Sequence, residues 1–378
     1  MTKTTHRFTL TAMAALSTLA AAGAVQAQNV TLYGVIDTGI ETVSNTAAGG
    51  TITRLPSNTG IFASRWGMRG KEDLGGGLAA VFTLESGFSP DTGAMGQGGR
   101  LFGRQALVGL SGDWGAVTLG RQYSMLYWSM MDADIVGPSV FGVGSLDAYV
   151  PNSRHDNAIV YRGKFDALSL GASYSLGRDT AAATPPNPTA TNCAGEAGSD
   201  VQACRAWSLM AKYDTASWGA ALAYDLQHGR TLTSATDTVF GGLTSSAKTD
   251  ARLSVNGYAK FGDAKVAAGL IRRDNDGSAT RPKSNLWYVG ASYALSPAWT
   301  VDGTVARLAY KDVSNADSTL VAVRALYKLS KRTTVYGQLG HISNQSAVAV
   351  SVSGGAAGSN PLAGGSQTGT MFGINHAF

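Results

Sequence analysis

Alternation of apolar and polar residues with a period of two is the feature that most limits how this chain can fold. In "LSLGASYSL", residues 168–176, the leucines, the alanine and the tyrosine fall on one face, and serine and glycine fall on the other. The stretches 287–295, "WYVGASYAL", and 321–329, "VAVRALYKL", repeat this pattern. Successive side chains of a strand point to opposite faces, so each stretch predicts a strand with one apolar face. Strands of about ten residues are long enough to cross a bilayer at a tilt.

The connections between these strands form two sets, one short and one long. The seven short connections are "DLGGGL", "SGDWGA", "RGKFDA", "DTASWG", "FGDAK", "LSPAW" and "LSKRT". The long connections are polar and irregular, such as "PDTGAMGQGG" and "SVSGGAAGSNPLAGGSQ". Seven hairpins supply fourteen strands, and the end segments "VTLYGVIDTGIE" and "TMFGINHAF" raise the number to sixteen. Short turns at one end and long loops at the other are typical of an up-and-down barrel in an outer membrane.

We therefore predict an all-β fold, a 16-stranded antiparallel transmembrane β-barrel. An even number of strands lets the terminal strands pair, which leaves no open edge in lipid. A barrel of this size encloses water. A large secreted β-sandwich or β-helix is the soluble alternative. Aromatic residues near the ends of the strands favour the barrel, because such residues form girdles at membrane interfaces; they are Tyr174, Tyr213, Phe261, Tyr293, Trp299 and Tyr327.

The first residues have the pattern of an export signal. Lys3 and Arg7 precede the apolar run "FTLTAMAALSTLAAAGAV", and the sequence "VQA", typical of a cleavage site, ends at Ala27. This order predicts a secretory signal peptide over residues 1–27 and a barrel domain over residues 28–378. A membrane anchor is the weaker alternative, because the run is rich in alanine and threonine. After residue 27 no apolar run is long enough for a spanning helix.

Charge and cysteine content narrow the choice of partners. The formal net charge is +5. Removing Lys3 and Arg7 leaves a mild basic excess without the clustered basic face that nucleic acid requires. Cys193 and Cys204 lie close together in a segment rich in proline and glycine, which in an exported protein predicts a disulfide. Metal binding is the weaker interpretation, since no histidine or further cysteine lies nearby, and we predict no metal and no cofactor.

Four stretches resemble the general porins of Gram-negative outer membranes, most of all their betaproteobacterial branch. They are "VTLYGVIDTGIE", "SRWGMRGKEDLGGGLAAVFTLESGF", "GRLFGRQALVGLSGDWGAVTLGRQY" and the terminal "GINHAF". The resemblance implies a homotrimer in outer-membrane lipid and lipopolysaccharide that passes small hydrophilic solutes and ions by diffusion. It implies that the third long connection, residues 124–153, folds into the lumen. It also implies that the barrel assembly machinery reads the terminal strand, which ends at Phe378.

The resemblance further implies a pore constriction in which arginines of the wall face carboxylates of the inward loop. Position by position, the arginines are Arg65, Arg104 and Arg154, the carboxylates are Asp132 and Asp134, and Arg121 is a neighbour on the same wall. Opposed charges across a narrow, water-filled gap produce a transverse field that biases ion flux by sign. Arginine suits this role because it stays charged whatever its neighbours are. The alternative is that each arginine pairs with a carboxylate of the wall, such as Glu72 or Glu85.

Period-two counting gives an independent prediction of the faces. If Trp66, Met68, Leu107 and Gly109 face lipid, then the residues that face the lumen are Arg65, Arg69, Lys71, Arg104, Ala106 and Val108. On the first strand the lumen-facing positions would be Tyr33, Val35 and Asp37. The family sometimes has a lysine there, so we expect only a mild preference for anions.

Two other functions remain as alternatives. A channel specific for sugars or aromatic acids could use Tyr127, Trp128, Phe141 and Tyr149 of the inward loop as stacking surfaces, although these residues could equally form the hydrophobic core of that loop. Some outer-membrane barrels are enzymes with a histidine and an aspartate or serine at the rim. Asp225 and His228 are three residues apart on a predicted strand, so their side chains would point to opposite faces. We therefore predict that the chain is not an enzyme.

Overall fold

The computed structural model describes residues 30–56, 60–178, 193, 195–232, 239–354 and 358–378, so the predicted signal peptide lies outside it. The strands are β1 (Thr31–Val43), β2 (Ile52–Arg54), β3 (Arg65–Gly75), β4 (Leu78–Gly87), β5 (Gln105–Gly112), β6 (Gly115–Tyr123), β7 (Arg154–Phe165), β8 (Leu168–Ser175), β9 (Ala206–Asp214), β10 (Trp218–His228), β11 (Thr249–Phe261), β12 (Ala264–Asn275), β13 (Lys283–Ala294), β14 (Trp299–Tyr310), β15 (Ser318–Lys328), β16 (Thr333–Asn344) and β17 (Gln367–Ala377). The short helices are α2 (Gly96–Gly99), α3 (Met125–Met130), η1 (Val143–Ser145), η2 (Val150–Asn152) and η3 (Phe240–Gly242). Within these ranges, no helix has both the length and the apolar character needed to cross a membrane.

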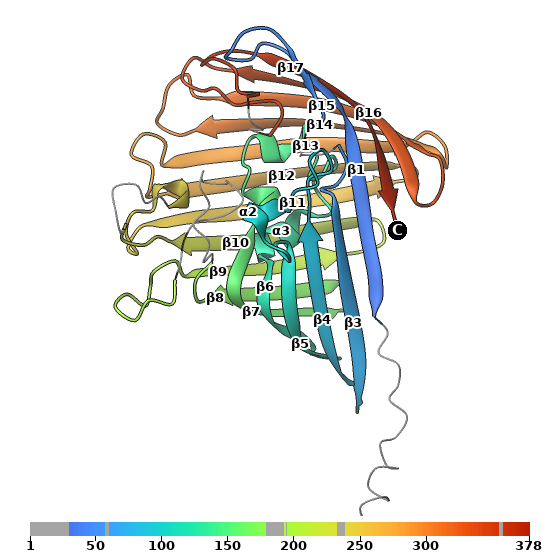
Figure 1. The fold of residues 1–378 in the computed structure, drawn as a ribbon, viewed down its shortest axis with the longest axis vertical. Coiled ribbons are helices and arrows are strands. Elements are labelled where there is room, and N and C mark those ends of the chain that lie inside the picture. Colours follow the sequence, from blue (N-terminus) through green and yellow to red (C-terminus); the bar gives the residue numbers. More distant parts are fainter. Residues whose placement is uncertain (1–29, 57–59, 179–192, 194, 233–238, 355–357) are drawn as a thin grey trace, which may run out of the picture.

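Sixteen of the strands form one closed antiparallel barrel (Figure 1). From β3 to β17 each strand pairs with the next, and β1 closes the ring by pairing with β3 on one side and with β17 on the other. The closing register runs from Val35 opposite Ala377 to Val43 opposite Gly369. The additional strand β2 is a three-residue piece of the first long connection and pairs only with the end of β1. The predicted fold class is confirmed, and each of the seven short connections joins the two strands of a hairpin.

The outer surface of the barrel is apolar, as the alternation predicts. Val289 on β13 and Val323 on β15 are about half exposed, whereas the residues that alternate with them, such as Tyr288 and Arg324, are buried inside. Five of the six predicted girdle aromatics lie beside short turns. Tyr174 does not, because it lies at the long-loop end of β8, where Arg205 donates a hydrogen bond of 2.8 Å to its hydroxyl group.

The predicted faces of β5 are wrong. Gln105 pairs with Glu85 of β4, and both line a cavity inside the barrel, so the odd-numbered residues of β5 face the lumen. Val108 is 58% exposed on the outer surface, in line with Leu119 of β6. The counting failed because it began at Arg104. That residue precedes the regular strand, and its side chain reaches the interior without following the alternation of β5.

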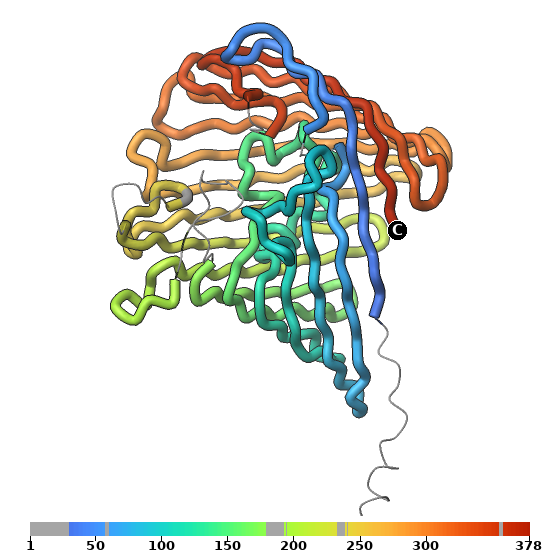
Figure 2. The backbone as a smooth tube through the Cα atoms, in the orientation of Figure 1, coloured from blue at the N-terminus to red at the C-terminus, as the bar shows by residue number. Residues whose placement is uncertain are grey.

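The connection between β6 and β7, residues 124–153, folds into the lumen and is called the inward loop below (Figure 2). Its apolar side chains pack against the inner wall formed by β12 to β17, which confirms the predicted inward fold. The ring of Phe141 is fully buried and lies over Gly340 of β16 and Gly369 of β17, where a Cβ atom would collide with it. Helix α3, at the start of the loop, contacts β9 and β10. The loop therefore narrows the lumen from one side.

Two arginines of the wall hold the inward loop in place. Arg324 on β15 donates a hydrogen bond of 3.0 Å to the backbone oxygen of Val136, while two other nitrogens of its guanidinium group bind Asp302. Arg252 on β11 donates to Asp147 at 2.9 Å, and its guanidinium group lies over the ring of Tyr149. Polar anchors at two separate points and apolar packing between them fix the position of the loop.

Two further predicted features lie away from the lumen. Cys193 and Cys204 form a disulfide in the connection between β8 and β9, with their Cα atoms 5.3 Å apart. The ring of Phe378 lies against Gly34 of β1, and the backbone of Phe378 exchanges two hydrogen bonds with that glycine. The last residue of the chain thus takes part in closing the barrel.

Candidate functional site: a constriction between the inward loop and the wall

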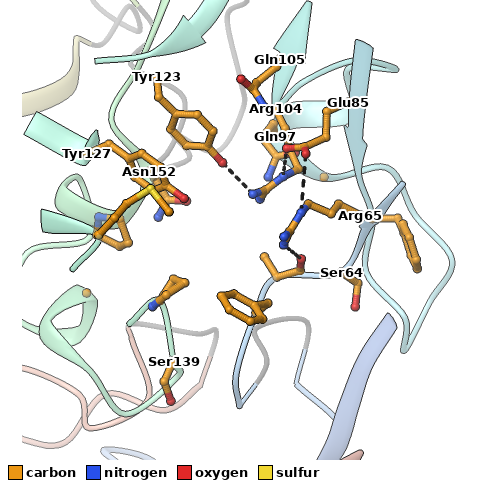
Figure 3. Close-up of a pocket in the computed structure, with 18 of the residues that line it drawn as sticks. Ser64, Arg65, Glu85, Gln97, Arg104, Gln105, Tyr123, Tyr127, Ser139 and Asn152 are labelled. Carbon is orange, nitrogen blue, oxygen red and sulfur yellow. Dashed lines mark hydrogen bonds and ion pairs between the residues drawn. The ribbon is translucent and has the colours of Figure 1, made fainter. Parts of the chain in front are cut away.

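A cavity of about 740 Å³ lies between the inward loop and the part of the wall formed by β1, β3, β4 and β5, and we call it the constriction cavity (Figure 3). The first two long connections contribute to its lining as well, through Phe62 and Gln97 among others. The inward loop approaches from the opposite side with Pro138, Ser139 and Val140. The passage through the barrel is therefore narrowed by the loop at this level.

The carboxylate of Glu85 on β4 organises the wall side of the cavity. Its Oε1 atom accepts a hydrogen bond of 2.7 Å from Nε of Arg104, and its Oε2 atom accepts one of 2.9 Å from the hydroxyl group of Tyr33. Arg65 forms an ion pair with the same carboxylate at 3.5 Å. Since Glu85 is almost fully buried, these three donors replace the water that it has lost.

Tyr123, the last residue of β6, joins two arginines. Its hydroxyl oxygen accepts hydrogen bonds from Arg104, at 2.6 Å, and from Arg154. The guanidinium carbon of Arg154 lies 4.2 Å from the centre of the Tyr123 ring, and the ring of Tyr127 stacks on the Tyr123 ring with the two ring centres 3.8 Å apart. In Figure 3 the hydroxyl group of Tyr123 points toward the guanidinium group of Arg104, and both residues line the cavity. Arg154 thus supports Tyr123 from behind, and Arg104 presents its charge to the cavity.

Charge in the cavity is unbalanced in favour of cations. Among the described residues of its lining the cations are Arg65, Arg69 and Arg104, whereas Glu85 is the one carboxylate. The guanidinium group of Arg69 lies 5.3 Å from the centre of the Tyr33 ring. The loop side presents uncharged groups, of which Ser139 is held by a hydrogen bond of 2.9 Å to Gln338 of β16. A solute in the cavity therefore meets a wall with an excess of positive charge.

The loop carboxylates do not face these arginines, in contrast to the arrangement that the resemblance implies. Asp132 forms an ion pair with Lys212 of β9 and lines a different cavity on the other side of helix α3. Asp134 accepts a hydrogen bond of 3.1 Å from the backbone of Gly137. Burial raises the pKa of Asp134 to about 7, although Arg324 nearby acts in the opposite direction. The reason is the path of the loop, which directs Asp132 toward Lys212 on β9 and Asp134 toward Arg324 on β15.

Arg121 also lies away from the constriction cavity. On the neighbouring strand β5 it lies opposite Ala106. Ala106 belongs to the same outward-facing row of β5 as Val108. Its guanidinium group forms an ion pair with Asp156 and donates a hydrogen bond of 2.7 Å to the backbone oxygen of Gly103. Of the six residues predicted for the constriction, the structure thus places Arg65 and Arg104 in the lining and Arg154 directly behind it.

Sequence reasoning missed three residues of this site. Arg69 was placed on the lumen face by counting, but its position alone did not single it out. Tyr33 was likewise placed on the lumen face by counting alone, whereas Tyr123 carried no signal, because a tyrosine at the end of a strand is equally typical of a girdle residue. Glu85 was named as a partner for an arginine in the alternative to the constriction. In the structure Arg104 pairs with Glu85 and also lines the cavity.

The aromatic residues of the inward loop divide into two groups. Phe141 and Tyr149 are buried and belong to the packing of the loop against the wall. Tyr127 and Trp128 line the constriction cavity, with their ring centres 5.5 Å apart. Phe141 and Tyr149 thus belong to the packed part of the loop, while Tyr127 and Trp128 are the two that lie at the cavity.

Comparison with known proteins agrees with this architecture. A family model described as Gram-negative porin matches residues 9–347. Outer membrane porin protein 32 of Delftia acidovorans is 31% identical over 384 residues, which cover 96% of this chain and 98% of that protein. Among solved structures, the anion-selective porin from Comamonas acidovorans superposes with a TM-score of 0.74 at 28% identity, covering 93% of this chain and all of that one. The trimer form of OmpT from Vibrio cholerae, at 15% identity and a TM-score of 0.64, shares the fold.

Proposed function

The chain belongs to the Gram-negative porin family, and we propose that its constriction cavity gives this outer-membrane diffusion channel a mild preference for anions. The observation that carries the proposal is the presence of three arginines against one carboxylate in the lining. Fixed charge in a narrow aqueous passage raises the local concentration of ions of opposite sign. The similar porin from Comamonas acidovorans is described as anion-selective, which supports the same direction here.

Within this proposal the three arginines have different roles. Arg104 and Arg65 carry charge at the passage, and Glu85 holds both of them in position. Arg154 is a positioning residue, because it lies outside the lining and acts on the cavity through two lining residues that it binds, Tyr123 and Asn152. Because the loop side is neutral and the wall has an excess of cations, the proposed selectivity follows from net positive charge and not from opposed charges across the passage.

The assembly of the channel follows from the same family. We propose that it forms a homotrimer, for which the trimer form of OmpT is the structural precedent. The terminal strand β17, which Phe378 follows, would present its outward row of Phe372, Ile374 and His376 to the barrel assembly machinery. The surrounding lipid and lipopolysaccharide would contact the apolar outer surface. The relatives are channels, and we propose no catalysis.

Recording from planar bilayers tests this function. The purified protein, reconstituted with a tenfold gradient of KCl, should give ohmic steps that occur in groups of three. Its reversal potential should have the sign of chloride selectivity. A zero or cation-selective reversal potential would contradict the anion preference, and the absence of ohmic steps would contradict the channel itself.

A further inference from the structure

A second cavity of about 370 Å³ lies on the other side of helix α3 from the constriction cavity. It is formed by the end of that helix and by β7, β8 and β9, close to their short turns. Trp128 and Met131 line both cavities, so this part of the inward loop lies between them. A solute that has passed the constriction would enter the second cavity next.

The second cavity has an excess of cations too. Arg162 and Lys164 lie two residues apart on the same face of β7, and Lys212 reaches the cavity from β9. The register places Ser169 opposite both Lys164 and Lys212, so the two lysines lie on either side of β8 at one level. Against these three cations the lining has one carboxylate, that of Asp132.

Arg162 is the distinctive member of this group. Its guanidinium carbon lies 3.6 Å from the centre of the Trp128 ring, so the indole supports one face of the guanidinium group. Among the described residues no carboxylate forms an ion pair with Arg162 or Lys164. An arginine that is stacked but not neutralised keeps its in-plane donors for another acceptor.

Asp132 shows what kind of group this cavity can bind. Its carboxylate is bonded to Lys212, which also forms an ion pair of 3.2 Å with Asp214. The side chain of Asp132 is 46% exposed, so a carboxylate from solution can compete with it. The thioethers of Met131 and Met210 and the Trp128 ring supply apolar surface beside the cations.

We propose that the second cavity is a binding site for small carboxylates with an apolar body, such as benzoate. The carboxylate would bind Arg162 and Lys164, and the apolar body would lie against Met131 and Trp128. Binding sites for small molecules combine apolar walls with a few convergent polar groups. Hydrogen bonds between a cationic side chain and a carboxylate are stronger than those between neutral groups. The inference rests on the proposed channel, because only an open lumen brings such an anion to the cavity.

Block of chloride current by benzoate tests the site. With the full-length protein in planar bilayers, benzoate on both sides should reduce the conductance at concentrations at which acetate does not. The R162Q variant should raise the half-blocking concentration about tenfold, since a hydrogen bond to a charged group contributes that much. The D132N variant should lower it, because it removes the competing carboxylate from Lys212. K164Q is the second variant to use if R162Q does not assemble.

The K260Q variant is the matched control. Lys260 is on β11 in the same half of the barrel, where it lies 5.5 Å from the centre of the Tyr258 ring and outside the lining of the second cavity. Equal shifts for R162Q and K260Q would mean that benzoate responds only to the overall charge of the lumen, which would overturn the site. Equal block by benzoate and acetate would overturn it too. Failure of the proposed channel is a separate result, since no ohmic conductance would then be present to block.

Discussion

The two sides of the inward loop differ in nearly every physical respect. One side packs against β12 to β17 through buried apolar residues such as Phe141, and wall arginines bond to its backbone and to Asp147. The other side faces β1 to β5 across the constriction cavity and presents uncharged groups to three arginines. The packed side fixes the position of the loop, and in our proposal the open side sets which ions pass. The two properties should therefore respond to different substitutions.

The largest effect is expected on the packed side. Replacing Phe141 with alanine removes a fully buried ring from between the loop and two glycines of the wall. Such substitutions cost about 3–5 kcal/mol in well-packed cores. We expect a lower urea midpoint for unfolding in detergent and a noisier, larger single-channel conductance, while the sign of selectivity is retained. Unchanged conductance would show that Phe141 does not hold the loop in the lumen.

On the open side, Arg104→Gln should change selectivity, and it should also lower stability, because the buried Glu85 carboxylate loses its charged partner. One unit charge about 5 Å from a passing ion in water contributes close to 1 kcal/mol, which corresponds to about a fourfold change in the permeability ratio. The reversal potential in a KCl gradient should move toward that of a cation channel. Arg121→Gln is the matched control, because Arg121 pairs with Asp156 away from the cavity. Equal shifts for the two variants would refute the assignment of Arg104 to the constriction.

Glu85→Gln should act in the opposite direction. It removes the one carboxylate among the described residues of the lining, so the preference for anions should rise. We expect about a two- to threefold change, less than for Arg104, because three donors already screen the Glu85 charge. Reversal potentials measure this as well. A shift toward cations would mean that Glu85 acts mainly by holding the arginines in place.

These contrasts also show what the sequence could and could not predict. Strand number, hairpins and the bounds of the inward loop followed from alternation and from turn length, because both are local properties. The faces of β5 did not, since Arg104 lies before the regular strand and its side chain departs from the alternation. β7 has an irregularity of its own at Asn157, where a positive φ accompanies a shift of register. Counting cannot detect such positions.

The partners of the two loop carboxylates could not be predicted from the sequence, for a different reason. Asp132 and Asp134 lie two residues apart, yet one bonds to Lys212 and the other lies near Arg324 on the far side of the barrel. Which wall residue a carboxylate meets depends on the path of the whole loop across the lumen. That path is set by the packing of Phe141 and its neighbours, and the packing is a tertiary property.

The smallest expected effect is a dependence of selectivity on pH. Burial raises the pKa of Asp134 to about 7, so this carboxyl group is mostly ionised at pH 8 and mostly protonated at pH 6. Protonation removes one negative charge from the lumen, and the preference for anions should therefore rise as the pH falls. The change should stay under about twofold, because Asp134 lies outside the lining of the constriction cavity and salt screens its charge. The Asp134→Asn variant should have the same reversal potential at pH 6 and pH 8. If that variant keeps the full pH dependence, another titrating group is responsible, and Asp134 has no part in setting the charge of the open side.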